Sequence, residues 1–411
     1  MFTIERGLLH SMLSRAGNPP VRLALWNGEE ICLCSGPPVA TIRIRDKATL
    51  PGLLFDPETY FGDAYADGRI QVEGDLRSLL ESLYVARQNA RWPGWYARLA
   101  ERWREWRQAN TPRGSRKNIH HHYDIGTDFY KLWLDRELVY TCAYFPSPSD
   151  SLEEAQVAKM HYVCRKVHLR PGETVVEAGC GWGALALHMA RHYGVSVKAF
   201  NISHDQVLHA RQRAKEEGLE GRVEFIEDDY RNISGRFDVF VSVGMLEHVG
   251  IGHYEELGGV IDRCLHSSGR GFIHSIGRNA PTSLNGWIRK RIFPGAQPPT
   301  LGQMMEILEP RGFSVLDVEN LRLHYARTLE HWLERFEKSL REVSAMFDER
   351  FVRAWRLYLA GSATAFRTGS LQLFQVVFAR ASVNRLPWTR AYLYESAPEE
   401  GTETKWIHAM P

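Results

Sequence analysis

Apolar and polar residues follow two different patterns in the two parts of the chain. Within the first 90 residues, apolar side chains alternate with polar ones over short runs such as 40–45, and turn-forming residues such as 36–38 interrupt these runs. Such alternation predicts short strands and turns over residues 21–72. A helical spacing that ends before two prolines predicts an amphipathic helix packed on this core, formed by Leu8, Leu9, Met12 and Leu13. A small α+β unit is expected here.

The larger, later part of the chain alternates strand-length apolar runs with longer helical patterns. Strands are expected at residues 174–178, 195–200, 223–226, 237–243 and 271–276. Strands that alternate with helices build an open α/β sheet, which carries its ligand site at the carboxyl ends of the strands. Aromatic residues at helical spacings over residues 329–367 predict C-terminal helices that complete the core.

A basic, tryptophan-rich segment separates the two parts. Between residues 91 and 117 there are eight basic and two acidic residues, with four apolar residues on one helical face, Trp95, Leu99, Trp103 and Trp106. This pattern is typical of a helix on an anionic membrane surface, and packing between two domains explains it equally well. The polar stretch that follows predicts a domain boundary, giving domains 1–108 and 109–411.

Composition excludes several classes of protein. The chain has 411 residues, of which 44% are hydrophobic and 24% are charged, as in an ordinary globular protein rather than a disordered or fibrous one. Its net charge of +2 supplies no overall field to attract nucleic acid. Residues 1–20 lack the features of a secretory signal, and no apolar run reaches the roughly 18 residues of a membrane span. Six cysteines without a CxxC pair predict reduced thiols in a cytoplasm.

A glycine-rich loop follows the first strand of the expected sheet. It contains Glu177, Gly179, Gly181 and Gly183 in an E-x-G-x-G-x-G pattern. Glycines allow a ligand to approach the backbone, and such loops bind both dinucleotides and S-adenosylmethionine (SAM). A carboxylate at this place suits the ammonium group of SAM, and the acidic residue that a dinucleotide requires about 20 residues later is absent. The loop therefore favours SAM-dependent methyl transfer.

Further motifs, in the same order along the chain, occupy residues 122–130, 140–145, 177–183, 244–250, 272–277, 287–295 and 325–332. Together they resemble cyclopropane-fatty-acyl-phospholipid synthases and the related mycolic acid cyclopropane synthases. Residues 64–75 resemble the additional lipid-handling domain of the phospholipid enzymes. The resemblance implies a class I SAM-dependent methyltransferase, with a Rossmann-like open sheet and a smaller N-terminal α+β lipid-interaction domain. It also implies methyl transfer to the cis double bond of an unsaturated phospholipid acyl chain, with closure of a cyclopropane ring.

The resemblance also assigns residues to the SAM site. Those expected to bind SAM are Tyr123, Tyr140, Thr141, Glu177, Gly179, Gly181, Gly183, Asn201, Ile202, Gln206, Asp229 and Tyr230. Asn201 departs from the threonine that relatives usually carry, but an amide can still form a hydrogen bond with a ribose.

Ring closure requires a shielded base. An alkene has no proton to lose before it attacks the methyl group, so the barrier lies in a carbocation, which aromatic rings can stabilise; the candidates are Tyr144, Phe145 and Trp287. The added methyl group must then lose a proton away from bulk water. The resemblance implies that the base is a bound bicarbonate ion, held by Glu247, His274, Tyr325 and the backbone of Cys142 and Ile276. No step requires the Cys142 thiol as a nucleophile.

Alternatives stay open at this point. The same cation chemistry can end in a methyl-branched or methylene product, and the chain could instead be a non-catalytic lipid-binding or lipid-transfer protein. Residues 120–122, and His188 with His192, have ligand-like spacing, but no carboxylate or cysteine completes either set, so no metal is expected. His188 and His192 are interpreted as a solvated helix face.

The expected partners are unsaturated phospholipid acyl chains, an anionic membrane surface and, from the resemblance, a second copy of the chain in a homodimer. Residues 287–293 combine three cations with bulky apolar residues, which fits either a lid that touches lipid headgroups or a plain surface loop. The C-terminal helices are expected to form a wall of the acyl channel. The predicted location is cytoplasmic, with peripheral association to the inner membrane.

Overall fold

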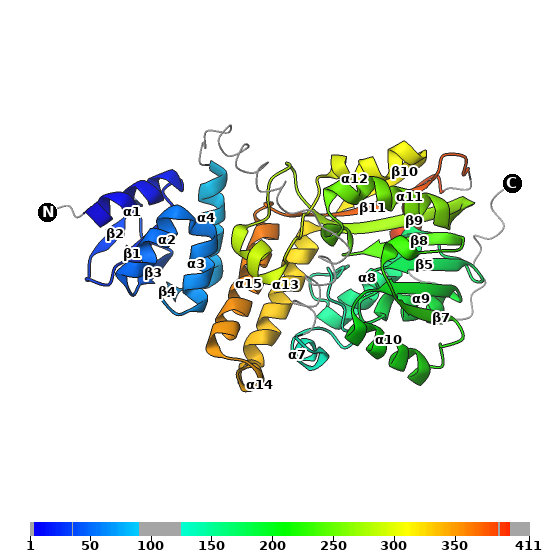
Figure 1. Ribbon diagram of the computed structural model, residues 1–411, viewed down its shortest axis with the longest axis horizontal. Helices are drawn as coiled ribbons and strands as arrows, with labels where there is room; N and C mark the ends of the chain where they lie inside the picture. The colour runs from blue at the N-terminus through cyan, green and yellow to red at the C-terminus, as the bar shows by residue number, and fades with distance from the viewer. Residues whose placement is uncertain (1–3, 35, 90–124, 385–386, 395–411) are drawn as a thin grey trace.

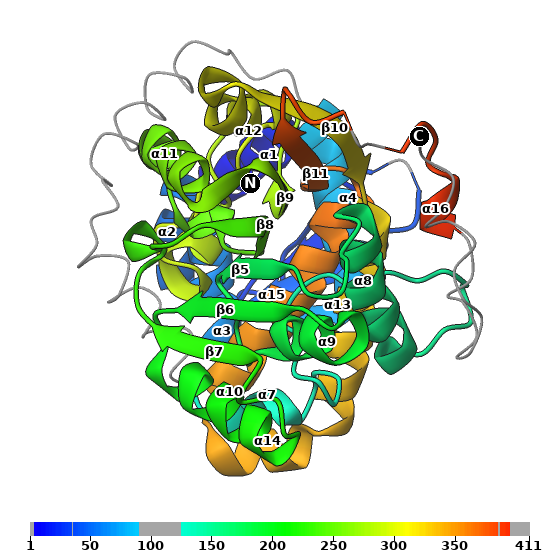
Figure 2. The same cartoon turned by 90° about the vertical axis from the view of Figure 1, so that its right-hand side faces the viewer.

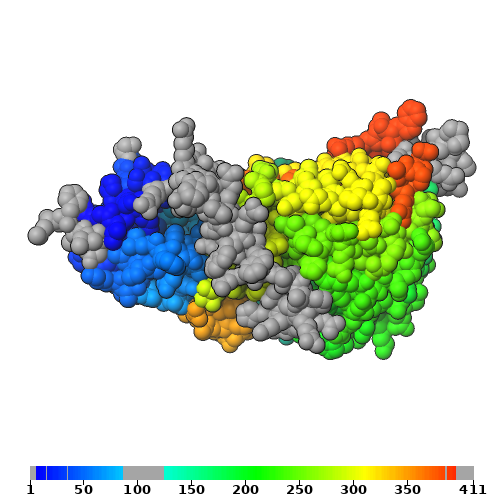
Figure 3. Space-filling model, turned by 45° about the horizontal axis from the view of Figure 1, so that its top comes forward, coloured from blue at the N-terminus to red at the C-terminus, as the bar shows by residue number. Residues whose placement is uncertain are grey.

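The computed structural model describes residues 4–34, 36–89, 125–384 and 387–394, and these residues form two units. The smaller N-terminal unit lies at one end of an elongated molecule, and the larger unit forms the other end (Figures 1 and 3). The predicted basic helix and the predicted domain boundary after residue 108 lie outside the described residues.

The N-terminal unit is built on a four-stranded sheet in the order β2-β1-β3-β4. Its strands are β1 (Val21–Ala24), β2 (Glu30–Cys32), β3 (Ala40–Ile44) and β4 (Ile70–Gly74). Its helices are α1 (Ile4–Arg15), η1 (Lys47–Thr49), α2 (Leu50–Phe55), α3 (Pro57–Ala66) and α4 (Leu76–Asn89). Leu9 and Leu13 of α1 are buried in the core of this unit, while Leu8 is exposed. The predicted α+β unit, with the first helix packed on it, is confirmed.

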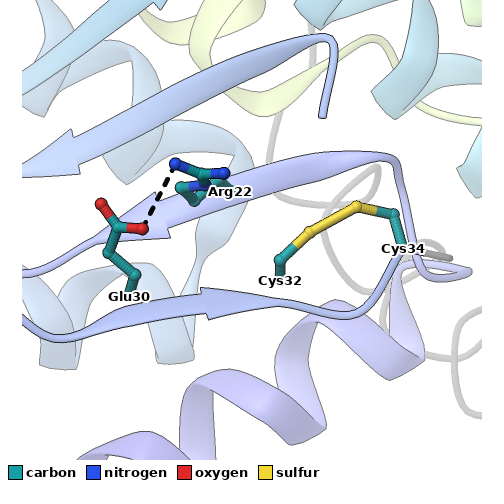
Figure 4. Close-up of a disulfide and its surroundings, with 4 residues drawn as sticks. All are labelled: Arg22, Glu30, Cys32 and Cys34. Carbon is teal, nitrogen blue, oxygen red and sulfur yellow. Dashed lines mark ion pairs between the residues drawn. A yellow bond between two sulfur atoms is a disulfide. The ribbon is translucent and has the colours of Figure 1, made fainter. Parts of the chain in front are cut away.

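The prediction that every thiol is reduced is wrong for two cysteines. Cys32 is the last residue of β2, and the chain turns after it. The Cα atoms of Cys32 and Cys34 are 5.6 Å apart, which is within the range of a disulfide, and their sulfurs are bonded (Figure 4). The ion pair between Arg22 of β1 and Glu30 of β2 joins these two paired strands nearby (Figure 4). The remaining four cysteines are free and buried, namely Cys142, Cys164, Cys180 and Cys264.

The larger unit contains a seven-stranded sheet in the order β10-β11-β9-β8-β5-β6-β7. The strands are β5 (Thr174–Ala178), β6 (Ser196–Asn201), β7 (Val223–Glu227), β8 (Phe237–Val243), β9 (Leu265–Gly277), β10 (Phe313–Asn320) and β11 (Gln372–Arg380). Strands β5 to β9 run parallel, and β11 pairs antiparallel with both β9 and β10. All five predicted strands are present. The sequence analysis did not predict β10 and β11.

Helices cover both faces of this sheet (Figure 2). One face packs against α8 (Leu152–Lys166), α9 (Ala184–Tyr193) and α10 (His204–Glu216), and the other against α11 (Tyr254–Cys264) and α12 (Leu301–Leu308). The capping box of Ser151 and Glu154 begins α8, so this helix starts at a defined residue beside the sheet. Short helical turns complete this region, namely η2 (Tyr230–Asn232), η3 (Leu246–His248), η4 (Ile251–His253), η5 (Ile288–Ile292) and η6 (Glu309–Arg311).

Three C-terminal helices lie between the large sheet and the N-terminal unit (Figure 1). They are α13 (Arg322–Lys338), α14 (Leu340–Met346) and α15 (Glu349–Arg367), with α7 (Thr127–Lys131) packed beside them and α16 (Ala391–Tyr394) farther along the chain. Trp332, Phe336, Trp355 and Phe366 are buried, which confirms that these helices complete the core. Within the described residues, no helix is long and apolar enough to cross a membrane.

Candidate active site

The glycine loop places backbone rather than side chains at the end of β5. Gly179, Gly181 and Gly183 all have left-handed backbone angles, with φ of 86°, 54° and 86°. A Cβ on Gly183 would lie 2.6 Å from the Phe225 ring, whereas a Cβ on Gly181 would meet no atom within 4 Å. Gly183 therefore allows close packing of α9 on the sheet, and Gly181 leaves open space for a ligand.

A pocket opens beside this loop at the carboxyl ends of the parallel strands. It is lined by ten of the predicted SAM-binding residues, namely Tyr140, Thr141, Glu177, Gly179, Gly181, Asn201, Ile202, Gln206, Asp229 and Tyr230. Gly183 does not line it, and Tyr123 lies outside the described residues. Residues from four separate segments of the chain thus meet at the place where an open α/β sheet binds its ligand.

A buried carboxylate and a buried ammonium group lie at the inner wall of this pocket. Glu177 is 2% exposed, and its Oε2 has no hydrogen-bond partner among the described residues. Burial raises the pKa of Glu177 to about 7, and the nearby Lys159 ammonium opposes this rise. The Nζ of Lys159 donates a hydrogen bond to Thr141 Oγ1 at 3.1 Å. An unpaired carboxylate in this position suits a cationic ligand group.

Polar side chains on the opposite side are held by one another. The Nδ2 of Asn201 donates to Gly181 O at 3.2 Å and to Gln206 Oε1 at 2.8 Å, so the amide connects the glycine loop to α10. Asp229 is paired with Arg231 at 3.0 Å, and the Arg231 guanidinium lies over the Tyr230 ring. The predicted ribose contact of Asn201 remains a prediction, because its amide nitrogen already has two acceptors.

Three of the predicted base-holding residues lie close to the end of β9: His274 and Ile276 belong to this strand, and Glu247 lies in η3, which follows β8. The backbone N–H of Ile276 donates to Glu247 Oε1 at 2.5 Å, which brings these two residues into contact. Burial raises the pKa of Glu247 to about 7 and lowers that of His274 to about 3. Glu247 Oε2 and His274 Nε2 are buried and have no partner among the described residues. His274 precedes Ile276 by two residues on β9, so both side chains lie on one face of the sheet.

Tyr325 and Cys142 reach the same region from other elements. Leu321 donates from its N–H to Leu373 O, and Leu373 pairs with Ile276, so α13 begins beside this end of β9. Cys142 and Tyr325 belong to one buried apolar cluster, against which Ile276 packs. The residue after Cys142, Ala143, donates its N–H to the hydroxyl of Thr328, which is one turn after Tyr325 on α13. Burial raises the pKa of the Cys142 thiol, which disfavours its use as a nucleophile.

Aromatic rings fill the space beside the pocket. Tyr140, which lines the pocket, forms a hydrogen bond of 2.6 Å with the hydroxyl of Tyr358, and its ring lies 5.3 Å from that of Trp332. Of the predicted cation-stabilising residues, Phe145 and Trp287 are buried in this apolar cluster and Tyr144 packs against it. The result is an apolar, aromatic region that adjoins the pocket beside the glycine loop.

The predicted lid, residues 287–293, is tied to the N-terminal unit. A Cβ on Gly62 of α3 would lie 2.4 Å from the Trp287 ring, so this glycine permits the close contact. Arg291 pairs with Asp63 through two hydrogen bonds of 2.9 and 2.8 Å. Farther along, the N–H of Gln297 donates to the carbonyl of Glu247. The chain from Trp287 to Gln297 therefore connects α3 of the N-terminal unit with Glu247, a predicted catalytic residue.

The interpretation of His188 as solvated is wrong. His188 is 3% exposed because α9 packs on α8 at this point, with its ring 4.2 Å from that of His161, and burial lowers its pKa to about 2. His192 is exposed, as predicted. Among the described residues, no group of three or more His, Cys, Asp or Glu side chains is arranged to hold a metal ion. Residues 120–122 lie outside the described residues.

Several residues that line the pocket were not predicted from the sequence, including Lys159, Trp182, Met245 and His248. A signal for Lys159 was available. The buried positions of α8 are 152, 155, 156, 159, 160, 162, 163, 164 and 166, and Lys159 is a charged residue among them. A lysine on the apolar face of a helix that precedes a glycine loop is expected to have a specific partner.

Comparisons with known proteins give a consistent result. A family model described as "Mycolic acid cyclopropane synthetase" matches residues 110–376, and a domain of unknown function matches residues 8–91. A "Probable fatty acid methyltransferase" of Pseudomonas putida is 36% identical over 391 residues, covering 91% of this chain and 96% of the relative. "Cyclopropane-fatty-acyl-phospholipid synthase" of Escherichia coli K12 is 41% identical over 266 residues, covering 64% and 68%. The solved structure of the mycolic acid cyclopropane synthase CmaA1 complexed with SAH and CTAB has a TM-score of 0.61 at 29% identity, covering 64% of this chain and 98% of that chain. The class I SAM-dependent methyltransferase fold predicted from the sequence is confirmed.

Proposed function

Because the chain belongs to the mycolic acid cyclopropane synthetase family of SAM-dependent methyltransferases, we propose that it converts the cis double bond of an unsaturated phospholipid acyl chain into a cyclopropane. One observation carries the proposal: a pocket that contains charged and polar side chains beside a glycine loop adjoins an aromatic, apolar cluster, and buried carboxylates lie next to both. A methyl donor and a hydrocarbon chain require these two environments side by side.

SAM fits the pocket beside the glycine loop. The unpartnered Glu177 Oε2 offers an acceptor to the ammonium group of the methionine portion, and Gly181 leaves space where a side chain would stand. SAM would supply the electrophilic methyl group there. Tyr140 and Thr141 form the wall between this pocket and the apolar cluster, so they would align the methyl group with the acyl chain.

The apolar cluster suits a carbocation that forms without help from a base. Attack of the alkene places positive charge on the acyl chain, and the electron-rich faces of buried aromatic rings attract such a charge. Tyr140, Phe145 and Trp332 belong to or pack against this cluster. Their burial also keeps water away, which would otherwise capture the cation.

A bicarbonate ion fits the unpartnered atoms near the end of β9. When bound there, bicarbonate would supply a base that is small enough to sit beside the cation. The side-chain amide nitrogen of Gln375 lies 3.1 Å from His274 Nδ1. With this amide as the donor, the neutral imidazole would carry its proton on Nε2, which could then donate to an anion. Glu247 Oε2 can accept an O–H, while Oε1 stays bonded to Ile276.

A methyl-branched or methylene product is the second candidate. The Pseudomonas putida relative is described as a probable fatty acid methyltransferase, a name that does not specify a ring. All these outcomes start from the same cation. The ring forms when the new methyl group loses a proton and bonds to the cationic carbon, whereas a methylene group forms when a 1,2-hydride shift precedes loss of the methyl proton. A methyl-branched alkene forms when a proton of the acyl chain leaves instead.

Contact with an anionic membrane surface belongs to the same proposal. The lid exposes Lys290 and Arg291 beside the buried Trp287 and Ile292, and an exposed cationic rim around apolar side chains is typical of interfacial segments. Peripheral association with the cytoplasmic face of a membrane, and a homodimer, are part of the proposal and require direct measurement.

The deciding experiment is analysis of lipids after incubation of the purified protein with SAM and cis-unsaturated phospholipid vesicles, with and without bicarbonate. A gain of one methylene unit by mass spectrometry, with upfield ring protons by NMR, is the expected result. Olefinic or branched-methyl signals at the same mass would favour the second candidate, and no gain in mass would refute both.

A variant pair tests the base site in the same assay. Glu247→Gln is expected to reduce product formation by about 10²–10⁴-fold while it leaves SAM binding unchanged, because it removes one holder of the base. Glu255→Gln on the solvent side of α11, where the side chain is 91% exposed, is the matched control and is expected to behave as the wild type. Unaltered product formation by Glu247→Gln would refute the assignment.

A further inference from the structure

Lys159 is a buried cation that the proposed chemistry does not use. Its side chain extends from α8 into the wall of the cofactor pocket, and the residue is only 2% exposed. An isolated ammonium group is costly to bury, so a lysine in this place requires partners of opposite charge. Burial lowers the pKa of Lys159 to about 8, and the carboxylates of Asp135 and Glu177 act against this decrease.

Helix α8 holds the loop that forms one side of the pocket through two side chains. The Nε2 of Gln156 donates to the carbonyl of Val139 at 3.2 Å and to that of Thr141 at 2.9 Å. Lys159, one turn later, donates to the hydroxyl of Thr141 at 3.1 Å. Thr141 is therefore fixed at both its backbone and its side chain by the same face of one helix.

The charges that surround Glu177 are few. Lys159 and Cys164 face it from α8, and Cys180 faces it from the glycine loop. Burial raises the pKa of both thiols, so they are neutral at physiological pH. The neighbouring strands place Ala199 and Val241 opposite Glu177. Among the described residues, Lys159 is therefore the charged group that favours the ionised form of Glu177.

The other charged groups near this pair have partners of their own. Asp135 accepts hydrogen bonds from the N–H groups of Val139 and Glu137, and Cys142 also faces Lys159. Four further polar groups line the pocket, namely Asp228, Asp229, Arg231 and His248. Asp229 is paired with Arg231, Asp228 accepts from the N–H of Asp229 and from Asn232, and burial lowers the pKa of His248 to about 4.

We propose that Lys159 is a positioning residue of the cofactor pocket: its ammonium group fixes the Thr141 hydroxyl and balances the Glu177 carboxylate, which then stays charged toward the ammonium group of SAM. The inference rests on the SAM-binding role proposed above. It predicts that Lys159 acts on cofactor affinity through Glu177, without contact with the reacting atoms. Thr141 precedes Cys142, so the same contact fixes the loop that leads to the base site.

The test is calorimetric titration with S-adenosylhomocysteine between pH 5.5 and 8.5 for the wild type and Lys159→Met. The affinity ratio of the two proteins is compared at each pH, because the titration of the ligand amine cancels in that ratio. Loss of the cation raises the pKa of Glu177, so the variant is expected to bind about tenfold more weakly at pH 5.5, a difference that nearly disappears by pH 8.5.

Companion variants separate this role from a merely structural one. Lys159→Arg keeps the charge and is expected to keep the wild-type pH profile, and Lys159→Gln serves as the second neutral variant. Glu177→Gln is expected to bind S-adenosylhomocysteine weakly at every pH, because it has no carboxylate at this position whose protonation could lower the affinity in acid. Lys166→Met removes the other buried lysine of α8, which pairs with Asp317 and Glu319, and is expected to lower stability without moving the profile.

Each outcome has a defined meaning. An affinity ratio that is the same at every pH, or equal to one throughout, would overturn the proposed role of Lys159. A wild-type protein that fails to bind S-adenosylhomocysteine would instead refute the SAM-binding proposal, and the inference with it. A ratio that rises toward acid pH in both neutral variants, but not in Lys159→Arg, supports it.

Discussion

Replacing Gly181 or Gly183 by alanine separates the ligand-facing and core-facing sides of the glycine loop. Both residues have left-handed backbone angles, so each substitution costs about 1–2 kcal/mol of folding stability from the backbone alone. At Gly183 the new methyl group would also lie 2.6 Å from the Phe225 ring and 2.8 Å from the Ala210 Cβ. Overpacking of this kind adds about 1–3 kcal/mol, which gives a total of roughly 2–5 kcal/mol.

The Gly181 methyl group would meet no protein atom within 4 Å and would project into space that lines the pocket. Gly181→Ala is therefore expected to lose less stability but more affinity for S-adenosylhomocysteine than Gly183→Ala. Urea unfolding measures the first quantity and calorimetry the second. If both variants lost stability and affinity in equal proportion, the assignment of Gly181 to a ligand surface would be incorrect.

Three further predictions concern charged residues. Because burial raises the pKa of Glu177 from 4.5 to about 7, the stability associated with its neutral form is present below pH 4.5 and is lost as pH rises through 7. Glu177→Gln should therefore increase the free energy of unfolding at pH 8 by up to about 3 kcal/mol, seen as a higher melting temperature, but should not do so at pH 4. An equal increase at both pH values would contradict this. Asp63→Asn removes the partner of Arg291, so it should lower the folding stability by less than about 1 kcal/mol and also lower turnover on vesicles. Asp67→Asn, which removes the partner of Arg350 instead, is the control, and unchanged turnover in Asp63→Asn would contradict the prediction. Changing Arg102, Arg104 and Arg107 to glutamate should abolish vesicle flotation but not cofactor binding, and retained flotation would remove the interfacial-helix hypothesis.

Much of the fold could be predicted because its signals are local. The strands β5 and β8 begin and end at the predicted residues, since their apolar runs are bounded by turns and buried on both faces. The glycine loop was recognisable because three left-handed glycines between a strand and a helix have few other uses. Ten of the twelve predicted cofactor residues line one pocket. They could be predicted because most of them lie at or just after the carboxyl ends of parallel strands, where an open α/β sheet binds its ligand.

Other features depend on contacts between distant segments. Strand β11 lies between β9 and β10 although it follows three helices in the sequence, so its pairing could not be read from its own residues. His188 is a polar residue on α9, and it is buried because α8 packs against this helix and brings the His161 ring to 4.2 Å. The bond between Cys32 and Cys34 depends on how the chain turns after β2, which the two-residue spacing alone does not specify.

One short loop connects the two halves of the proposed chemistry. Tyr140 and Thr141 line the cofactor pocket, and the next residue, Cys142, lies in the apolar cluster with Tyr325. Helix α8 holds the first side of this loop through Gln156 and Lys159, and the Thr328 hydroxyl of α13 holds the other side at Ala143. A peptide bond does not stretch, so a shift of Thr141 must move Cys142 as well. Changes on α8 that loosen the cofactor wall should therefore also disturb the predicted base site, whereas changes within β9 should leave cofactor affinity intact.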